Sequence, residues 1–469
     1  MSRPPSSMPG HSAVVVGGGV AGLTAARRLA QQGLSVTLVE GSRRLGGQVH
    51  TTWLDGLPVD VGAEALVTSP STTALLAELR LVDTSIAPRT GATWLATPRG
   101  LRRLPAGVGP AGPSRLRPVV SSGILSARGV GRAALEPFTA RRHRGMADVS
   151  VGEFVTGRFG REVADRIVDP LLGGIASGDI DRLSLRACAP QLAPLLDSGR
   201  SVAVRAVLHR PRAAGPRLVT WARGLASLPM ALMDGVDLDL RLGDRATEVT
   251  RSPGGRYAVR LASGEALDAD AVVLAVSSAV AQPLLRDVVP AAAQALSGAR
   301  FATVATLVAA FPRSEALACP VLAGTGLMVP SSTGRLLKAA TFLSTKWPHL
   351  ASSDLFLGRL SAGRVGASTV DSLNDDELTA ALMADLAALT GFDTAPLRTV
   401  VHRWRETVAQ HELGHPERVR AARSALAEHP ALVLAGASYD GGGVAGCLRS
   451  GEAAARSAVE SLTEEVAAP

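Results

Sequence analysis

Alternation between strand-like and helix-like segments near the N-terminus predicts a βαβ unit. Ala13–Val16 is an apolar, β-branched run typical of a buried strand. The apolar spacing over Leu23–Gln32 predicts a helix that ends at Gly33, a residue type common at helix C-termini. A second strand is expected over Ser35–Val39, directly before Glu40. The unit takes about 30 residues, the length that a dinucleotide-binding βαβ unit requires.

The turn between the first strand and the helix carries glycines at the G-x-G-x-x-G spacing. Gly17 permits the tight turn, Gly19 lets the backbone approach a pyrophosphate, and Gly22 lets the helix pack closely on the strand. The helix N-terminus directs free N–H groups and its positive dipole end at the phosphates. A glycine turn without a ligand is the alternative interpretation. The predicted cofactor-binding residues of this turn are Gly17, Gly18, Gly19, Val20, Ala21 and Gly22.

Glu40 supplies the acid that a dinucleotide site needs at the end of its second strand. It lies 18 residues after Gly22, where a carboxylate can accept hydrogen bonds from ribose hydroxyls. A carboxylate at this position repels a 2′-phosphate, so NADP is disfavoured.

Two later segments have patterns that fit the same domain. Arg245–Ser278 reads as a strand, a turn, two further strands and then a buried strand. Leu432–Ser457 reads as an apolar strand, a glycine-rich turn and a helix that contains Ala453–Ala455. Backbone N–H groups at the start of that helix could support negative charge on a reduced cofactor.

Composition favours a globular protein of two or more domains. The chain has 469 residues, of which 46% are hydrophobic and 19% charged. An apolar run of about 20 residues, long enough for a spanning helix, is absent from the sequence. The polar, proline-rich start MSRPPSSMPGHS is expected to be a disordered lead-in without a signal peptide, which predicts a cytoplasmic protein. The three dispersed cysteines, Cys188, Cys319 and Cys447, argue against a disulfide framework and a structural zinc site.

The net charge of +8 comes mostly from arginine. The densest basic clusters, at residues 140–145 and 209–217, lack interleaved aromatic residues, which disfavours nucleic-acid binding. A basic rim that attracts an anionic small molecule fits as well. His411 and His415 have i, i+4 spacing near His402, but Gly414 and Pro416 interrupt the helix that would join them, so no metal site is predicted.

The segment EGSRRLGGQ, from Glu40 to Gln48, resembles the E-x-x-x-R-x-G-G motif of flavoproteins in the amine oxidase and porphyrinogen oxidase superfamily. The resemblance implies FAD rather than NAD. It implies that Arg44, Gly46 and Gly47 lie along FAD, and that Gly62, Ala63 and Glu64 pass near the flavin ring. It further places the backbone of Val249 at the adenine. In the C-terminal turn the implied cofactor-binding residues are Gly436, Tyr439, Gly443 and Val444.

Four further stretches resemble porphyrinogen oxidases of the soluble bacterial type. They are Val151–Leu192, Leu336–Trp347, Val401–His415 and the closing GASYDGGGVAGC. The apolar residues of the first stretch recur at helical spacing from Val151 to Ile167, which predicts an amphipathic helix there. The resemblance implies oxygen-dependent, six-electron oxidation of coproporphyrinogen III, and often of protoporphyrinogen IX, in haem biosynthesis. The chemistry then belongs mainly to the flavin, so no catalytic residue is assigned.

The implied fold is α/β, with a Rossmann-like FAD-binding domain interleaved with an α+β substrate-binding domain of mixed sheet and helices. The lead-in is expected over residues 1–12. The FAD-binding domain is expected to combine 13–95, 217–285 and 400–469, and the substrate-binding domain 96–216 and 286–399.

Basic side chains are candidates for holding the carboxylates of a porphyrinogen. Lys338 is preferred because it lies within a stretch that matches the family. Ala176, Gly442 and Ala445 depart from the family pattern, as do Gln48 and residues 409–411; these changes predict a looser backbone and a larger pocket. The basic candidates are Arg141, Arg142, Arg205, Lys338, Lys346 and Arg364.

Several alternatives stay open at this point. Another FAD-dependent oxidase or desaturase, acting on an amine or a carotenoid, is one; the 3% aromatic content disfavours an amine cage. A divergent paralogue of low activity and a flavin-free relative are others. The expected partners are a porphyrinogen and molecular oxygen, with a haem-pathway protein as a further candidate. Nucleic acid is not expected, membrane contact is at most peripheral, and the chain is expected to be a monomer or a homodimer.

Overall fold

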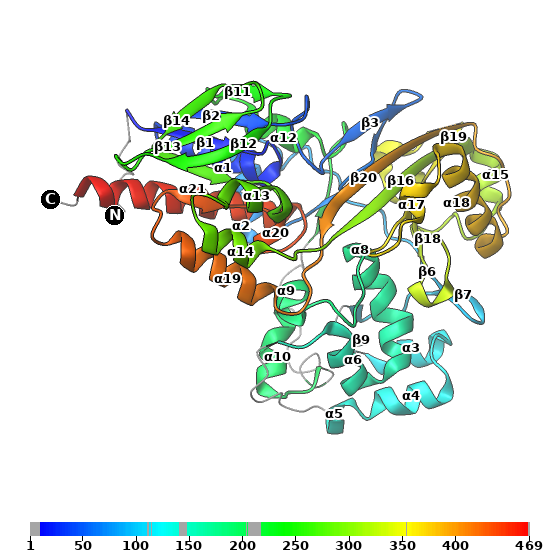
Figure 1. Ribbon diagram of the computed structural model, residues 1–469. Coiled ribbons are helices and arrows are strands. Elements are labelled where there is room, and N and C mark those ends of the chain that lie inside the picture. The colour runs from blue at the N-terminus through cyan, green and yellow to red at the C-terminus, as the bar shows by residue number, and fades with distance from the viewer. Residues whose placement is uncertain are drawn as a thin grey trace.

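The protein has three parts: a parallel-sheet part, a large mixed sheet and a helical lobe below them (Figure 1). The computed structural model describes residues 10–109, 112–113, 115–139, 148–202, 204, 217–352 and 354–467. The first strand and the last helix of the described chain both belong to the parallel-sheet part (Figure 1). Among the described residues, no helix has the length and apolar character needed to cross a membrane.

The parallel sheet has the strand order β11-β2-β1-β15-β21. All four strand pairs in it are parallel. Along β1, Ala13 and Val15 enter one hydrophobic cluster, and Val14 and Val16 enter another on the opposite face. The sheet is therefore buried on both sides, as parallel sheets usually are. Its strands are β1 (Ser12–Val16), β2 (Ser35–Glu40), β11 (Asp239–Leu242), β15 (Ala271–Leu274) and β21 (Leu432–Leu434).

Helices cover one face of this sheet, and a small antiparallel sheet with more helices covers the other. The first cover consists of α1 (Val20–Gln31), α2 (Pro70–Glu78), α12 (Ser227–Met233) and α21 (Val444–Ala467). The second consists of β12 (Ala246–Arg251), β13 (Tyr257–Leu261) and β14 (Ala266–Ala269), with α13 (Ser278–Leu285), α14 (Pro290–Leu296) and α19 (His415–Leu426). This arrangement confirms the predicted α/β class. The first helix begins at Val20, three positions before its predicted start.

The mixed sheet has seven strands in the order β20-β16-β19-β18-β17-β6-β7. Its outer face packs on α15 (Arg313–Ala318), α17 (Thr369–Ser372) and α18 (Asp375–Thr390). Its inner face packs on the hairpin of β3 (Thr51–Leu54) and β4 (Leu57–Asp60), and on α16 (Leu343–Lys346). The strands are β6 (Thr93–Thr97), β7 (Gly100–Arg103), β16 (Phe301–Pro312), β17 (Gly326–Met328), β18 (Leu337–Phe342), β19 (Leu355–Ala362) and β20 (Arg398–Ala409).

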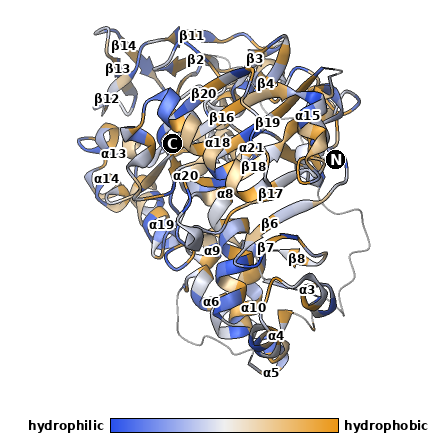
Figure 2. Cartoon of the chain, turned by 90° about the vertical axis from the view of Figure 1, so that its right-hand side faces the viewer, coloured by the Kyte–Doolittle hydropathy of each residue, from blue (hydrophilic) through white to orange (hydrophobic). Residues whose placement is uncertain are grey.

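The helical lobe lies below the two sheets, and α8 and α9 are the parts of it nearest to them (Figures 1 and 2). The helix predicted over Val151–Ile167 is interrupted: α6 ends at Phe159, because Gly160 adopts a φ of 93°. The chain then continues through α7 into the π-helix η1, which contains Pro170. The lobe comprises α3 (Leu116–Ser122), α4 (Ala127–Ala134), α5 (Glu136–Thr139), α6 (Val151–Phe159), α7 (Arg161–Val163), η1 (Ala164–Gly173), α8 (Gly174–Ala176), α9 (Leu185–Cys188), η2 (Pro190–Leu192) and α10 (Ala193–Ser198).

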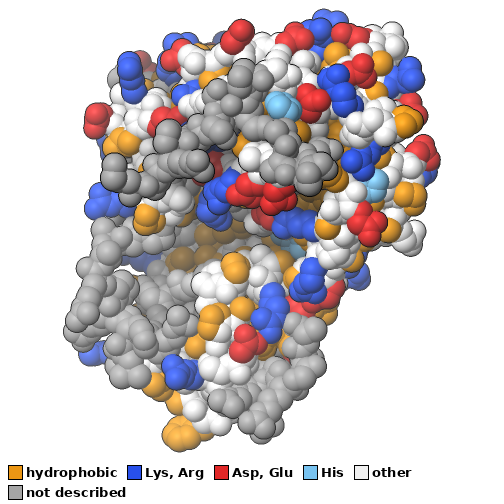
Figure 3. Space-filling model, turned by 90° about the vertical axis from the view of Figure 1, so that its left-hand side faces the viewer, with side chains coloured by type: hydrophobic (Ala, Val, Ile, Leu, Met, Phe, Trp, Pro, Cys, Tyr) orange, Lys and Arg blue, Asp and Glu red, His pale blue; other side chains and the backbone are white. Residues whose placement is uncertain are grey.

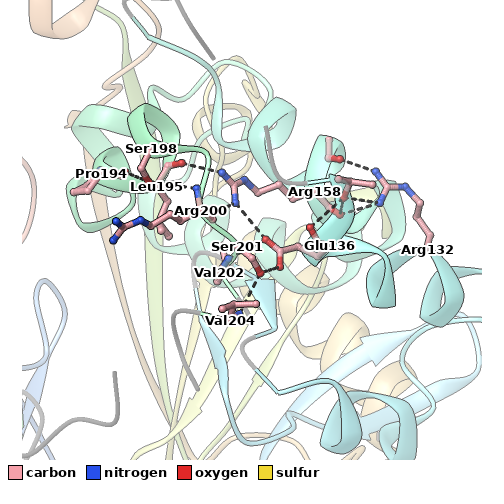
Figure 4. Close-up of polar contacts among 12 residues, drawn as sticks. Arg132, Glu136, Arg158, Pro194, Leu195, Ser198, Arg200, Ser201, Val202 and Val204 are labelled. Carbon is pink, nitrogen blue, oxygen red and sulfur yellow. Dashed lines mark hydrogen bonds and ion pairs between the residues drawn. The ribbon is translucent and has the colours of Figure 1, made fainter. Parts of the chain in front are cut away.

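A buried ion pair fastens this lobe internally (Figure 4). Arg158 on α6 donates from Nη1 to Glu136 Oε1 over 3.2 Å, and both side chains are almost fully buried. Ser201 Oγ and the Val202 N–H also donate to this carboxylate. The Arg158 guanidinium donates to the carbonyls of Leu195 and Arg200 and lies 4.4 Å from the Phe154 ring centroid.

The remaining short elements connect these parts. They are β5 (Leu66–Val67), β8 (Val108–Gly109), β9 (Gly112–Pro113), β10 (Leu218–Val219), η3 (Ser331–Thr333), η4 (Pro348–Leu350) and α20 (Ala437–Asp440). The strands β6 and β20 belong to the mixed sheet, although the predicted division assigned most of their residues to the FAD-binding domain. Likewise α14 packs on the parallel-sheet part. The division into an FAD-binding and a substrate-binding domain stays a prediction.

Candidate functional site

The glycine turn after β1 has the geometry that its spacing predicted. Gly17 has a φ of 108°, and its N–H donates to Val39 O over 2.7 Å. A Cβ on Gly22 would stand 1.8 Å from Gly17 O, and a Cβ on Gly17 would stand 2.6 Å from Ala275 O. Both positions therefore require glycine, one for the turn itself and the other for the close packing of helix on strand.

The N-terminus of α1 is open to an anion. Gly19 is its N-cap, none of the described side chains caps it, and its first turn contains no acidic residue. A Cβ built on Gly19 would approach only the Gly47 Cα, at 3.8 Å, so the backbone is accessible there. Unsatisfied N–H groups and the positive end of the helix dipole together favour a phosphate at this point.

Glu40 is fixed at the end of β2 by backbone donors. Its Oε2 accepts from the Gly18 N–H over 2.8 Å, and its Oε1 accepts from the Ser42 N–H over 2.7 Å. A carboxylate has about four acceptor sites, so two remain for ribose hydroxyls.

A second glycine pair lies over the first turn. Gly46 donates to Gly18 O over 2.8 Å and forms a parallel bridge with Gly19. Arg44 shapes this loop, since its guanidinium donates to Leu45 O and Val49 O over 3.1 Å each and to Gly47 O over 2.7 Å. Its contacts in the structure are thus to the loop, and its predicted place along FAD stays a prediction.

A cavity of about 540 Å³ opens next to Arg44, between the 44–51 loop and α12. An aromatic cluster that the sequence did not predict lies beside this arginine, and His50 of this cluster also lines the cavity. The ring centroids of His50 and His402 are 5.1 Å apart, and those of His402 and Trp404 are 4.3 Å apart. Burial, followed by the charge of Arg44, lowers the pKa of His50 to about 4. The signal in the sequence for this cluster was the spacing of two between His402 and Trp404, which places both side chains on one face of a strand.

The Gly62–Glu64 segment is held between the parallel-sheet part and the mixed sheet. Arg359 on β19 donates to Gly62 O over 2.6 Å, and Trp404 on β20 donates to Val61 O over 2.9 Å. A Cβ on Gly62 would stand 2.0 Å from Gln48 O, so only glycine fits.

Glu64 is the acceptor of a compact polar cluster. Its Oε1 accepts from Lys346 Nζ over 2.7 Å and from the indole N–H of Trp347 over 2.6 Å, while Arg359 lies 3.2 Å from Oε2. Burial raises the pKa of Glu64, but the charges of Lys346 and Arg359 outweigh it and hold the pKa below its usual range. Lys346, a predicted carboxylate-binding candidate, is thus paired with a carboxylate of the chain itself.

The C-terminal turn lies against the first turn of α1. Gly451 on α21 packs so closely that a Cβ on it would stand 2.3 Å from Ala21 O. Gly436 has a φ of 114°, and its N–H donates to Ser450 Oγ over 2.7 Å. The buried Tyr439 hydroxyl donates to Val276 O over 3.1 Å. Around Gly441, Gly442 and Gly443, no described atom would come within 4 Å of an added Cβ, so this turn has room beside it.

The other predicted residues have diverse surroundings. Val249 is buried in the β12–β13 pair, with its side chain in the core. Lys338 is 7% exposed, and its Nζ contacts Ser177 Oγ. Arg364 donates to Val329 O over 3.0 Å, and Ala176 is half-buried on α8. Arg141, Arg142 and Arg205 lie outside the described residues.

Gln410, which the predicted site did not include, bridges β20 and the helical lobe. Its Nε2 donates to Ala176 O and to Val408 O over 3.0 Å each. His411 is buried next to it, and its Nε2 lies 2.8 Å from Ala437 O. Within the described part of the chain, no group of three or more His, Cys, Asp and Glu residues could hold a metal ion.

The molecular surface is hollowed between the upper and lower parts (Figure 3). Hydrophobic side chains lie in the hollow, and basic and acidic side chains gather at its upper rim (Figure 3). Such a concave, mostly apolar site with a few polar groups is typical of small-molecule binding.

Comparisons with known proteins agree with this geometry. The family model described as flavin containing amine oxidoreductase matches residues 20–459. The coproporphyrinogen III oxidase of Bacillus subtilis (strain 168) is 31% identical, with 96% of this chain and 98% of the relative covered. The enzyme of the same name from Mycobacterium leprae (strain TN) is 34% identical, with 98% and 100% covered.

Solved structures have the same fold. A crystal structure from Exiguobacterium sp. 255-15, provisionally named a protoporphyrinogen oxidase, is 27% identical with a TM-score of 0.84, and the match covers 97% of this chain and 99% of that one. A putrescine oxidase variant is 17% identical with a TM-score of 0.66, at 97% and 99% coverage; that likeness concerns the fold alone.

Proposed function

The chain belongs to the flavin containing amine oxidoreductase family, and we propose that it is an FAD-dependent oxidase of porphyrinogens that acts in haem biosynthesis. Coproporphyrinogen III is the proposed substrate, with protoporphyrinogen IX as a second. The relatives named coproporphyrinogen III oxidase support this proposal, because the likeness extends over nearly the whole of both chains.

The observation that carries the cofactor proposal is the double glycine turn at α1. Gly19 and Gly47 leave the backbone accessible at the uncapped helix N-terminus, and Glu40 stands at the neighbouring strand end. This donor set fits a dinucleotide with a pyrophosphate and a free ribose, as in FAD. The residues proposed to hold FAD are Gly17, Gly18, Gly19, Val20, Ala21, Gly22, Glu40, Arg44, Gly46, Gly47, Gly62, Ala63, Glu64, Val249, Gly436, Tyr439, Gly443 and Val444.

The protein's own contribution is to bind and orient both molecules and to exclude water. When bound, the flavin supplies a two-electron oxidation of the substrate. Three such oxidations, each followed by reoxidation of the flavin by oxygen, remove six electrons in total. Arg359 and Trp404 fix the segment proposed to pass the flavin ring, at Gly62 and Val61. Arg364 is proposed to hold a substrate carboxylate, Lys338 is proposed to lie on the substrate side of the site, and Ala176 is proposed to enlarge the pocket.

Three alternative functions make different predictions. Amine oxidases share this fold at 16–17% identity, a likeness that concerns the fold and not the substrate. A carotenoid desaturase would need an apolar tunnel for a long chain. A low-activity paralogue would bind FAD and oxidise porphyrinogens slowly.

The experiment is a porphyrin fluorescence assay on the purified holoprotein. Equimolar FAD, appearance of coproporphyrin III fluorescence and release of hydrogen peroxide with oxygen uptake support the proposal. Oxidation of amines or carotenoids without any porphyrin product would overturn it. A rate far below that of the B. subtilis relative, measured side by side, would identify a low-activity paralogue.

The proposal includes a cytoplasmic location. Its partners are the porphyrinogen and oxygen, and a haem-pathway protein that receives the product is a further candidate. Sedimentation of the holoprotein distinguishes a monomer from a homodimer.

A further inference from the structure

A bend at the end of the π-helix is attached to the mixed sheet by three separate hydrogen bonds. This 174–178 bend comprises α8, Ser177 and Gly178. Gln410 Nε2 on the chain after β20 donates to Ala176 O over 3.0 Å. Lys338 Nζ on β18 donates to Ser177 Oγ, and the Val365 N–H donates to Ser177 O over 2.8 Å. Three segments of the sheet part thus hold one short bend.

These contacts are buried. Ser177, Gln410 and Lys338 are 1%, 3% and 7% exposed. A Cβ on Gly178 would stand 2.4 Å from Gln410 Oε1, so the bend packs directly on this amide. Gln410 Nε2 faces two backbone carbonyls, and only the NH2 group of the amide can donate to them. These two contacts therefore fix which end of the Gln410 amide is nitrogen and which is oxygen. Breaking buried hydrogen bonds of this kind is costly, because water does not replace the lost partner.

The bend is in a conformation that the surroundings must enforce. Ser177 has a φ of 53° and a ψ of 29°, in the left-handed region. This costs a residue with a side chain about 1 kcal/mol, and it persists where neighbouring groups over-determine it. Lys338 and Val365 supply that constraint through the hydroxyl and the carbonyl of the same residue.

The bend lies on the inner side of the mixed sheet, where the proposed site is. Arg359 and Trp404 contact Gly62 and Val61 from this sheet, while Lys338 and Gln410 contact the bend. In Figure 1, α8 lies at the end of the helical lobe that faces the mixed sheet. The bend carries Ile175, an apolar side chain that is 78% exposed. An exposed isoleucine on a rigid support is suited to an apolar ligand surface.

We propose that Gln410 and Lys338 are positioning residues that hold the 174–178 bend, which carries Ala176 of the proposed substrate site, in a fixed position and thereby set porphyrinogen affinity. The proposal rests on the proposed function. It gives Lys338 a role through Ser177 instead of a direct contact with a substrate carboxylate.

The charges around Lys338 agree with a positioning role. Arg359 on β19 and Arg364 after β19 face it; Asp169 on η1 interacts with Arg364, and Glu64 pairs with Arg359. Burial, then Arg364 and Arg359, lowers the pKa of Lys338 to about 7. An uncharged Lys338 amine can donate to Ser177 without a buried counter-charge. A side chain that binds a substrate carboxylate would instead need to be a cation.

The test compares three variants with the wild-type holoenzyme. Gln410→Leu removes the donor, Gln410→Glu keeps the shape but replaces the donor by an acceptor, and Ser177→Ala removes only the hydroxyl. Gln294→Leu makes the first change at an exposed position on α14 and is the matched control. Hydrogen exchange is followed in the 173–183 segment and in the 20–31 segment of α1. KM and kcat are measured for coproporphyrinogen III and protoporphyrinogen IX.

The proposal predicts faster exchange in 173–183 for all three variants and unchanged exchange in α1. KM should rise about five- to tenfold, the effect of one lost buried hydrogen bond, while kcat stays within twofold. Both Gln410 variants should behave alike, because the donor and not the volume matters. Wild-type exchange and KM in the Gln410 variants would overturn the positioning role. If the wild type oxidises no porphyrinogen, the proposed function fails, whereas the exchange measurement still decides whether these residues fix the bend.

Discussion

Gly451 of α21 packs against Ala21 of α1 so closely that a Cβ on Gly451 would stand 2.3 Å from Ala21 O. This contact joins residues near the two ends of the chain, within the first turn of the helix that begins the proposed phosphate site. The C-terminal helix therefore supports the position of α1 as well as its own turn.

The first prediction follows from this contact. Gly451→Ala forces α21 away from α1 and should lower the free energy of unfolding by about 1–3 kcal/mol, as overpacking does. It should also lower the flavin content of the purified protein. Chemical denaturation and flavin absorbance measure the two effects. Gly131→Ala on α4, where no described atom would lie within 4 Å of the added Cβ, is the control and should be neutral or stabilising.

The second prediction concerns Arg44, whose guanidinium donates to three carbonyls of the 45–49 loop. Arg44→Ala removes these bonds and frees the second glycine turn, so the dissociation constant for FAD should rise at least tenfold. Titration of the apoprotein with FAD measures it. Arg43→Ala, at the exposed neighbouring position, should change the constant less than threefold. Equal effects of both substitutions would mean that charge alone matters.

The third prediction tests the ion pair in Figure 4. Arg158→Met removes the arginine from the buried Glu136 carboxylate and should cost about 3–5 kcal/mol of unfolding free energy. The double variant with Glu136→Met should regain part of this loss, because neither charge then remains buried. Denaturant titration of both variants decides the point. Arg161→Met breaks only exposed pairs on α7 and should cost less than about 1 kcal/mol.

The fourth prediction is a pH dependence from Lys338. Its pKa in the folded protein is about 7, below the usual lysine value of 10.5, so between these pH values the unfolded state binds one more proton than the folded state. The contribution of Lys338 to the free energy of unfolding therefore rises with pH between about 7 and 10.5. This contribution is lost as the pH falls through about 7. The difference in unfolding free energy between wild type and Lys338→Met should change by roughly 2 kcal/mol from pH 7.5 to 9.

Thermal and chemical denaturation at several pH values give that difference. Ser177→Ala is the control, since it removes the hydroxyl contact but keeps the amine. It should lower stability by a similar amount at each pH. A pH-independent difference between wild type and Lys338→Met would show that Lys338 is charged in the folded protein.

Short-range features of the site were predictable from the sequence. The spacing of Gly17, Gly19 and Gly22 between a strand and a helix predicted the turn that the structure shows. Here the chain itself sets the geometry, because the turn and the packing of helix on strand involve residues close in sequence. The expected flavoprotein family and the α/β class are likewise confirmed.

Other features depended on packing. The helix expected over Val151–Ile167 is broken at Gly160, which has a φ of 93°, and the chain then passes into a π-helix. Gln410 and Ala176 are 234 residues apart, and no local pattern relates them. Lys338 was expected to face a substrate carboxylate, whereas in the structure its amine contacts Ser177.

The sequence by itself determined four of the five strands of the parallel sheet, all but β11, together with its first helix and the glycine turn between β1 and α1. The periodicity of hydrophobic residues and the conformational freedom of glycine each depend on only a few neighbouring residues, so both can be predicted from the sequence. Only the tertiary structure decided which strand ends, loops and helices surround the proposed flavin and substrate. Those neighbours are set by burial of the shared core, which brings together Gly451 with Ala21 and Gln410 with Ala176 across more than 200 residues.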